Sequence, residues 1–189
     1  MTNLGDPRVT RTRQLIREAF RDLLRHRGFD AITIKDIAQR ATINRATFYA
    51  HYEDKYALLE KITEQAFQEM IPEQVVKAQK FTDEICTQLI LLTHNYIVDF
   101  YQVCRMDSKS MDTLVHEKVK MMLQQRIENI ILSGETQHMA DRHHTKVISA
   151  MTASAIYSAA HYWFMSGEKD GTDLFVDTVR SYIMNGLRL

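Results

Sequence analysis

Apolar residues recur at helical spacing along most of the chain. Within residues 13–27 they fall at positions i, i+1, i+4, i+5, i+8 and i+9: Leu15, Ile16, Ala19, Phe20, Leu23 and Leu24. This is the stripe of an amphipathic helix. Similar stripes predict helices over 55–71, 82–103, 114–132, 142–165 and 172–185, with loops at 73–81, 105–112 and 135–141. Few glycines and prolines interrupt the chain, and β-branched residues form no alternating runs, so the pattern predicts an all-α protein.

Two shorter helical patterns lie between residues 33 and 49. Thr33 is a good N-cap, and Asp36 three residues later gives a weak capping box. Thr42 and Ile43 form the expected turn, after which Asn44 caps a second helix of about two turns. Two short helices joined by such a turn indicate a helix-turn-helix, whose second helix enters the DNA major groove. Phe48 is expected to anchor that helix to the core.

The segment DIAQRATINRATFYAHYEDKYALL (36–59) resembles the DNA-binding segment of the TetR family of bacterial transcriptional regulators. The residues that match the family pattern are Asp36, Ile37, Ala38, Ala41, Thr47, Phe48, Tyr49, His51, Lys55 and Leu58. Tyr52 replaces the usual Phe, Asn44 the usual Ser, and Thr42 the usual turn glycine. Because a β-branched residue disfavours positive φ, a turn that needs such a backbone at Thr42 would be strained or reshaped.

The position of a side chain on the second short helix sets its expected role at DNA. N-terminal residues of a recognition helix read bases, so we expect Arg45 to contact guanine and Thr47 a thymine methyl group or a phosphate. Tyr49, His51, Thr33 and Lys55 are expected to contact phosphates or sugars. The alternative for Tyr49 and His51 is that they pack the third helix against the fourth. The predicted DNA-binding residues are Thr33, Thr42, Asn44, Arg45, Ala46, Thr47, Tyr49, His51 and Lys55.

Charge is unevenly distributed although the formal net charge is zero. Residues 7–50 hold ten Lys or Arg and four Asp or Glu, so the remainder of the chain is acidic. A basic head on an acidic body suits nucleic-acid contact at one end. The alternative is a solvated helix face on which Arg17 and Arg21 pair with Glu18 and Asp22.

The body is rich in methionine and aromatic residues, which suit a pocket for an apolar or aromatic small molecule. The alternative is that they form the core. The TetR resemblance implies an effector pocket, for which the candidates are Phe67, Met70, Tyr96, Phe100, Met122 and Tyr157. It also implies a homodimer built from the last two helices. The candidates for that interface are Ala155, Ala159, Tyr162, Trp163, Phe175, Val179 and Tyr182.

Other chemistry has little support in the sequence. It contains no glycine-rich phosphate loop, nucleophile elbow or H-E-x-x-H motif, so we expect no enzyme activity and no cofactor. His138, His143 and His144 are not spaced for one helical face, and no metal site is expected. Cys86 and Cys104 are interpreted as buried reduced thiols. We expect no membrane span and no signal peptide, and a cytoplasmic location.

The sequence therefore predicts two domains: a helix-turn-helix DNA-binding domain over 1–55, and a helical effector-binding and dimerisation domain over 56–189. As the resemblance implies, the predicted function is a dimeric repressor that binds a near-palindromic operator in double-stranded DNA and is released by an effector. One alternative is a regulator of the same fold controlled by a protein partner. Another is a small α-helical enzyme with an incidental helix-turn-helix.

Overall fold

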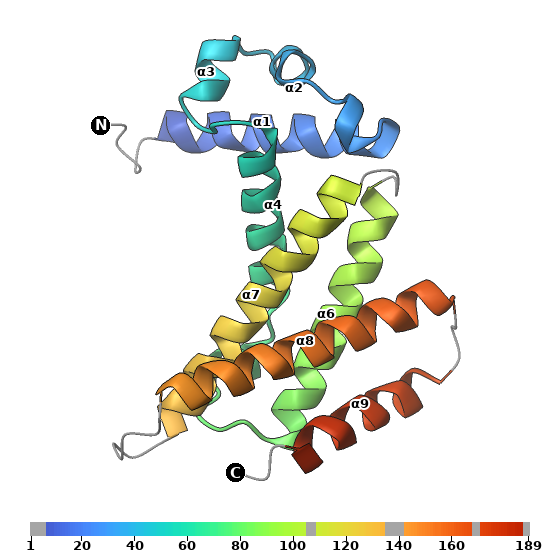
Figure 1. The fold of residues 1–189 in the computed structure, drawn as a ribbon. Coiled ribbons are helices and arrows are strands. Elements are labelled where there is room, and N and C mark those ends of the chain that lie inside the picture. The colour runs from blue at the N-terminus through green and yellow to red at the C-terminus, as the bar shows by residue number, and fades with distance from the viewer. Residues whose placement is uncertain (1–6, 105–108, 135–141, 168–170, 187–189) are drawn as a thin grey trace. The chain divides into compact units, whose positions relative to one another are not determined.

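The protein is built from helices (Figure 1). The computed structural model describes residues 7–104, 109–134, 142–167 and 171–186, and within these ranges it contains no strand. The elements are α1 (Pro7–His26), a 3-10 turn η1 (Phe29–Ala31), α2 (Ile34–Arg40), α3 (Arg45–Tyr49), α4 (Lys55–Met70), α5 (Glu73–Lys77), α6 (Asp83–Val103), α7 (Lys109–Gly134), α8 (Arg142–Ser166) and α9 (Thr172–Gly186). The predicted all-α class is confirmed.

The chain divides into two compact units. The first unit contains Met1–Thr63 and Phe100–Val115, and the second contains Glu64–Asp99 and His116–Leu189. The boundary thus passes through α4, and the corner between α6 and α7 groups with the N-terminal helices. The domain boundary predicted after residue 55 stays a prediction.

The first unit has its own apolar core. α1 packs on α2, and α2 on α3 (Figure 1). The fully buried rings of Phe20, Phe29 and Phe48 come from three different elements. Burying a phenylalanine side chain contributes about 1.5–3 kcal/mol, so these three rings stabilise the placement of the short helices, which would be marginal alone.

The predicted loop over 73–81 was wrong in its first half, where the structure has α5. Pro72 stands at the N-cap with φ −61° and ψ 146°, and Glu73 provides a carboxylate in the first turn. Val75 is fully buried, while its neighbour Val76 is half exposed. A five-residue helix with one buried side chain shows no readable period, which is why the apolar pattern missed it.

The predicted break over 105–112 was also wrong from residue 109 onward. α7 begins at Lys109, and Met111 in its first turn is fully buried. The Thr113 hydroxyl donates to the Lys109 carbonyl at 2.9 Å, as expected inside a helix. Residues 105–108 and the predicted loop at 135–141 lie outside the described residues.

The second unit is built on an extensively buried helix, α6. Its buried residues are Ile85, Cys86, Leu89, Ile90, Leu92, Thr93, Tyr96 and Ile97. α8 and α9 pack against each other (Figure 1). The rings of Trp163 on α8 and Phe175 on α9 are stacked, with centroids 5.0 Å apart. Cys86 in this unit and Cys104 in the first unit are free and buried, and burial raises the pKa of each thiol to about 12. Within the described ranges, no helix is both long and apolar enough to cross a membrane.

Candidate nucleic-acid interface

The start of α2 is fixed by a reciprocal capping box. The Thr33 hydroxyl accepts a hydrogen bond from the Asp36 N–H at 3.2 Å, and the Asp36 carboxylate accepts one from the Thr33 N–H at 2.9 Å. These bonds to Thr33 lower the pKa of Asp36, and Arg27, 3.4 Å from the carboxylate, lowers it further. The weak capping box predicted from sequence is confirmed. Thr33 therefore orients the helix-turn-helix, whatever else it contacts.

The end of α2 is a Schellman turn with threonine in the glycine position. The Ile43 N–H donates to the Ala38 carbonyl at 2.9 Å, and the Thr42 N–H donates to the Gln39 carbonyl at 3.2 Å. This pattern places Thr42 in the left-handed region with φ 57°. The predicted turn is confirmed despite the missing glycine, and Thr42 carries the strain that the sequence indicated.

α3 is short, capped and anchored from behind. The Asn44 side chain accepts hydrogen bonds from the Thr47 N–H at 2.7 Å and from the Thr47 hydroxyl at 2.9 Å. Phe48 is fully buried and packs against Tyr49 and Tyr52, at 5.8 and 5.9 Å between ring centroids. With Phe48 facing inward, the opposite surface of the helix consists of the exposed side chains of Arg45, Ala46 and Tyr49, with Thr47 half exposed. The helix thus presents the face that a recognition helix needs.

His51 lies just beyond α3 and is half buried. Its Nδ1 atom is buried and has no hydrogen-bond partner among the described residues. Burial lowers the pKa of His51, and the nearby positive charge of Arg13 lowers it further. The lowered pKa disfavours the charged imidazolium, which favours packing over attraction to a phosphate.

Lys55 begins α4, but its ammonium group points into the first unit. Nζ donates to the carbonyl oxygens of Phe29, Asp30 and Ile32 at 2.9, 3.2 and 3.0 Å, and lies 4.5 Å from the centre of the Phe29 ring. A lysine has three N–H donors, and all three are used here. Burial lowers the pKa of the ammonium, whereas the charge of Asp30 raises it. Lys55 therefore fastens the start of α4 to the η1 turn, a structural role that local sequence did not reveal.

Two of the basic residues in this unit are paired with acids. Arg40 Nη2 lies 2.8 Å from Asp22, and Arg27 lies 3.4 Å from Asp36. Within the part of the chain that the structure describes, Asp22 does not pair with Arg17 or Arg21, so the alternative of charges neutralised along one helix has little support. Exposed pairs of this kind contribute at most about 1 kcal/mol, so these two pairs hold their arginines only weakly.

Comparison with known proteins identifies this unit. Residues 16–62, from α1 to the middle of α4, match the family described as "Bacterial regulatory proteins, tetR family". This part of the first unit is therefore similar to the TetR family.

Individual relatives match this chain over about a third of its length. The "Uncharacterized HTH-type transcriptional regulator YxbF" of Bacillus subtilis is 42% identical over 67 residues, covering 35% of this chain and 18% of YxbF. The "HTH-type dhaKLM operon transcriptional activator DhaS" of Lactococcus lactis is 38% identical over 60 residues, covering 32% of each chain. The matches thus span a third or less of the relatives' length. A TetR regulator from Streptococcus agalactiae shares the fold over 97% of both chains, with a TM-score of 0.57 and 17% identity.

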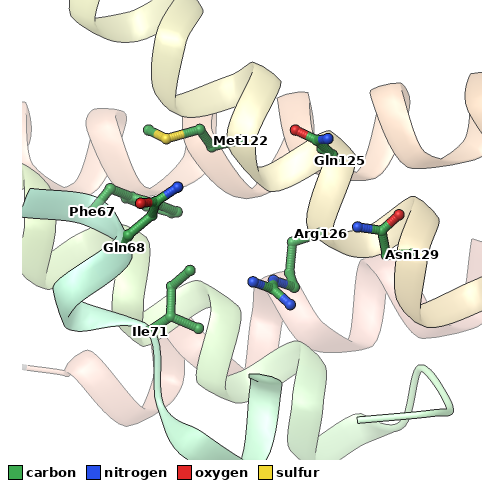
Figure 2. Close-up of a pocket in the computed structure, with 7 residues that line it drawn as sticks. All are labelled: Phe67, Gln68, Ile71, Met122, Gln125, Arg126 and Asn129. Carbon is green, nitrogen blue, oxygen red and sulfur yellow. The ribbon is translucent and has the colours of Figure 1, made fainter. Parts of the chain in front are cut away.

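The second unit contains a pocket of about 220 Å³ (Figure 2). It is lined by Phe67, Gln68, Ile71, Met122, Gln125, Arg126 and Asn129. Of the predicted effector residues, Phe67 and Met122 are in this lining. Tyr96 packs behind Phe67 with centroids 5.4 Å apart, Tyr157 is buried beside His116, and Phe100 lies in the first unit. The polar residues of this lining were not predicted from the sequence. Helical spacing could have grouped them, because residues 122, 125, 126 and 129 share one helical face.

The predicted dimer residues fall into two groups. Tyr162 and Tyr182 are about three-quarters exposed, and Ala155, Ala159 and Trp163 are half exposed. Phe175 and Val179 are buried within this chain, which leaves them little surface for a second copy. Met151 on α8 and Leu174 on α9 are also strongly exposed. Exposed apolar side chains therefore gather on α8 and α9, as a docking surface requires.

Proposed function

We propose that the protein is a dimeric DNA-binding transcriptional regulator. The observation that supports this most directly is α3: its buried Phe48 fixes the helix, and Arg45, Ala46 and Tyr49 stand on its exposed face behind a capped turn. Arg45 and Ala46, at the N-terminal end, contact base edges, and the surrounding arginines contact phosphates. The nine residues predicted from the sequence remain the proposed contact set, with two exceptions. The bonds of Lys55 favour a positioning role, and the burial of His51 favours packing.

The operator is proposed to be a near-palindrome read by two copies. A two-fold dimer places its recognition helices about 34 Å apart, or a related spacing, so that both enter the major groove on one face of the DNA. The exposed apolar side chains of α8 and α9 support pairing of two copies through these helices, which buries surface that is costly in water.

The regulator is proposed to act as a repressor that an effector releases. An effector bound in the second unit alters DNA binding only if it binds one conformation more tightly than the other. To move the DNA-competent fraction from 99% to 1%, that preference must reach about 10⁴-fold. The pocket on α4 supports such coupling, because α4 contributes residues to both units.

The experiment that tests the function begins with selection of bound sequences from a random DNA pool. The selected operator and a random duplex are then titrated with the wild type and with Arg45→Ala. We expect Arg45→Ala to weaken operator binding about 10–100-fold, because a bidentate guanine contact provides about 1–3 kcal/mol of discrimination, and to weaken random-DNA binding much less. Arg25→Ala is the matched control, since it removes one exposed charge from α1. Equal losses on both duplexes for Arg45→Ala would contradict a base-reading role.

Salt dependence provides an independent measure of the same interface. If six or more phosphates are contacted, affinity should fall roughly a thousandfold or more between 50 and 200 mM salt. A flat response would contradict binding through the basic head.

The second candidate is that the protein activates transcription instead of repressing it. It is favoured by the 60-residue match of this chain to a protein named as an operon activator. Control by a protein partner remains a further alternative, which the exposed apolar side chains of α8 and α9 would also suit. Transcription from the selected operator in the presence of the purified protein distinguishes the two directions: a fall indicates repression and a rise indicates activation.

A further inference from the structure

The pocket in the second unit combines an apolar side with a cationic side (Figure 2). Phe67 and Ile71 contribute apolar surface from α4 and the residue after it, and Met122 adds to that surface from α7. Arg126 extends from α7 into the same space, on the side toward Ile71 (Figure 2). The amide side chains of the lining are Gln68, Gln125 and Asn129, all of which are exposed.

Arg126 differs from the other half-buried cations in this unit. Lys118 lies 3.8 Å from Glu64, Lys120 pairs with Glu117 at 2.5 Å, and Arg180 lies 2.7 Å from Asp177. Arg126 has no carboxylate and no hydrogen-bond acceptor among the described residues, although it is half buried. A partly desolvated guanidinium without a counter-charge attracts an anion, and its planar fork matches the two oxygens of a carboxylate.

The size of the pocket limits the ligand. A cavity of about 150 Å³ accepts benzene, so a pocket of about 220 Å³ accommodates about nine non-hydrogen atoms. The Phe67 ring is held in place by the edge of Tyr96, which gives the ligand's apolar part a fixed surface. The neighbouring amides can donate to or accept from further polar groups on the ligand.

We propose that this pocket binds a small carboxylate whose apolar, flat portion lies against Phe67, Ile71 and Met122 while its anionic group is held by Arg126. This inference rests on the proposed function, because it names the chemical class of the effector in the same unit. The anionic requirement distinguishes it from the purely apolar ligand that the methionines and aromatic residues alone would favour.

The test uses benzoate and benzamide as probes in isothermal titration calorimetry on the full chain. Both have nine non-hydrogen atoms, but only benzoate carries the carboxylate. We expect wild-type protein to bind benzoate at least tenfold more tightly than benzamide, because charge-assisted hydrogen bonds exceed neutral ones in strength. Arg126→Ala should weaken benzoate about 10–100-fold and leave benzamide nearly unchanged, whereas Arg126→Lys should give an intermediate loss.

Lys120→Ala is the matched control, since it removes one positive charge from α7 outside the lining. It should bind benzoate as the wild type does. Equal affinity for the two probes, no binding of benzoate to the wild type, or the same loss in Lys120→Ala and Arg126→Ala would overturn the proposal. The comparison of the two probes on wild-type protein holds even if Arg126→Ala fails to fold.

The ligand proposal and the proposed function can fail independently of each other. Selection of DNA from a random pool tests regulation and requires no ligand. If DNA is selected but benzoate is not preferred, the ligand class is wrong and DNA binding stands. If benzoate is preferred through Arg126 but no DNA sequence is selected, the site stands and the regulatory function falls.

Discussion

Replacing Thr42 with glycine should stabilise the first unit. Thr42 has φ 57°, a conformation that costs a residue with a Cβ about 1–2 kcal/mol and a β-branched residue no less. Glycine relieves that strain. However, it gives the unfolded chain more conformational freedom, which lowers the free energy of unfolding by about 0.5–1 kcal/mol. The Thr42 side chain is exposed and makes no hydrogen bond within the described part of the chain, so nothing else is lost. The net gain is about 1 kcal/mol.

Urea unfolding followed by far-ultraviolet circular dichroism measures this gain. With an m-value near the upper end of about 1–3 kcal/mol per molar, the midpoint should rise by about 0.3–0.5 M, and the melting temperature by about 2–4 °C. Fluorescence is less suitable because the single tryptophan, Trp163, lies in the second unit. If the two units unfold separately, the transition of the first unit alone should move.

Thr42→Ala is the matched control. It removes the β-branch and the hydroxyl but keeps a Cβ at the same positive φ, so it should gain much less than Thr42→Gly. A glycine variant that is no more stable than the alanine variant, or less stable than the wild type, would refute the strain assigned to this turn. Unchanged operator binding in Thr42→Gly would further separate the strain from any DNA contact at this position.

Three other predictions test other parts of the structure. Lys55→Met should destabilise the protein by about 2–4 kcal/mol in urea unfolding, because three carbonyls lose a charged donor; a loss below about 0.5 kcal/mol would restore Lys55 to the phosphate contacts. Because burial places the pKa of His51 below its ordinary value of 6.5, the unfolded state binds more protons below that pH, so stability should fall as the solution is acidified. His51→Gln should flatten that part of the stability profile, and an unchanged profile would rule out His51 as its source. The double variant of Tyr162→Glu with Tyr182→Glu should sediment as a monomer where the wild type is a dimer, whereas Val76→Glu, another exposed apolar site, should leave the dimer intact.

Features fixed by neighbouring residues could be predicted from the sequence. The caps of α2 and α3 depend on bonds between residues three apart, such as Thr33 with Asp36 and Asn44 with Thr47, so their residue types and spacing were sufficient. The helix-turn-helix followed from those caps and from the anchor Phe48. The long helices followed from their apolar period, and only their ends shifted.

Features fixed by contacts across the chain could not be predicted in the same way. Lys55 bonds to carbonyls 23 to 26 residues earlier, and no local pattern shows which way its ammonium points. The sequence showed that α9 is rich in apolar residues, but it did not show which of them are buried within the chain. In the structure Phe175 and Val179 face their own chain, while Leu174 and Tyr182 face solvent. Arg126 was missed because its importance lies in what surrounds it rather than in its residue type.

The bonds of Lys55 also affect how chemical footprinting of this protein should be interpreted. An amine-reactive reagent modifies a lysine only when its ammonium group is accessible and can lose a proton. With Nζ engaged by three carbonyls and lying over the Phe29 ring, Lys55 should react slowly in the free protein as well as in the complex. Its protection therefore cannot be used as a sign of DNA contact, whereas the exposed Lys35 on α2 provides a lysine in the same unit whose reactivity can respond to the DNA.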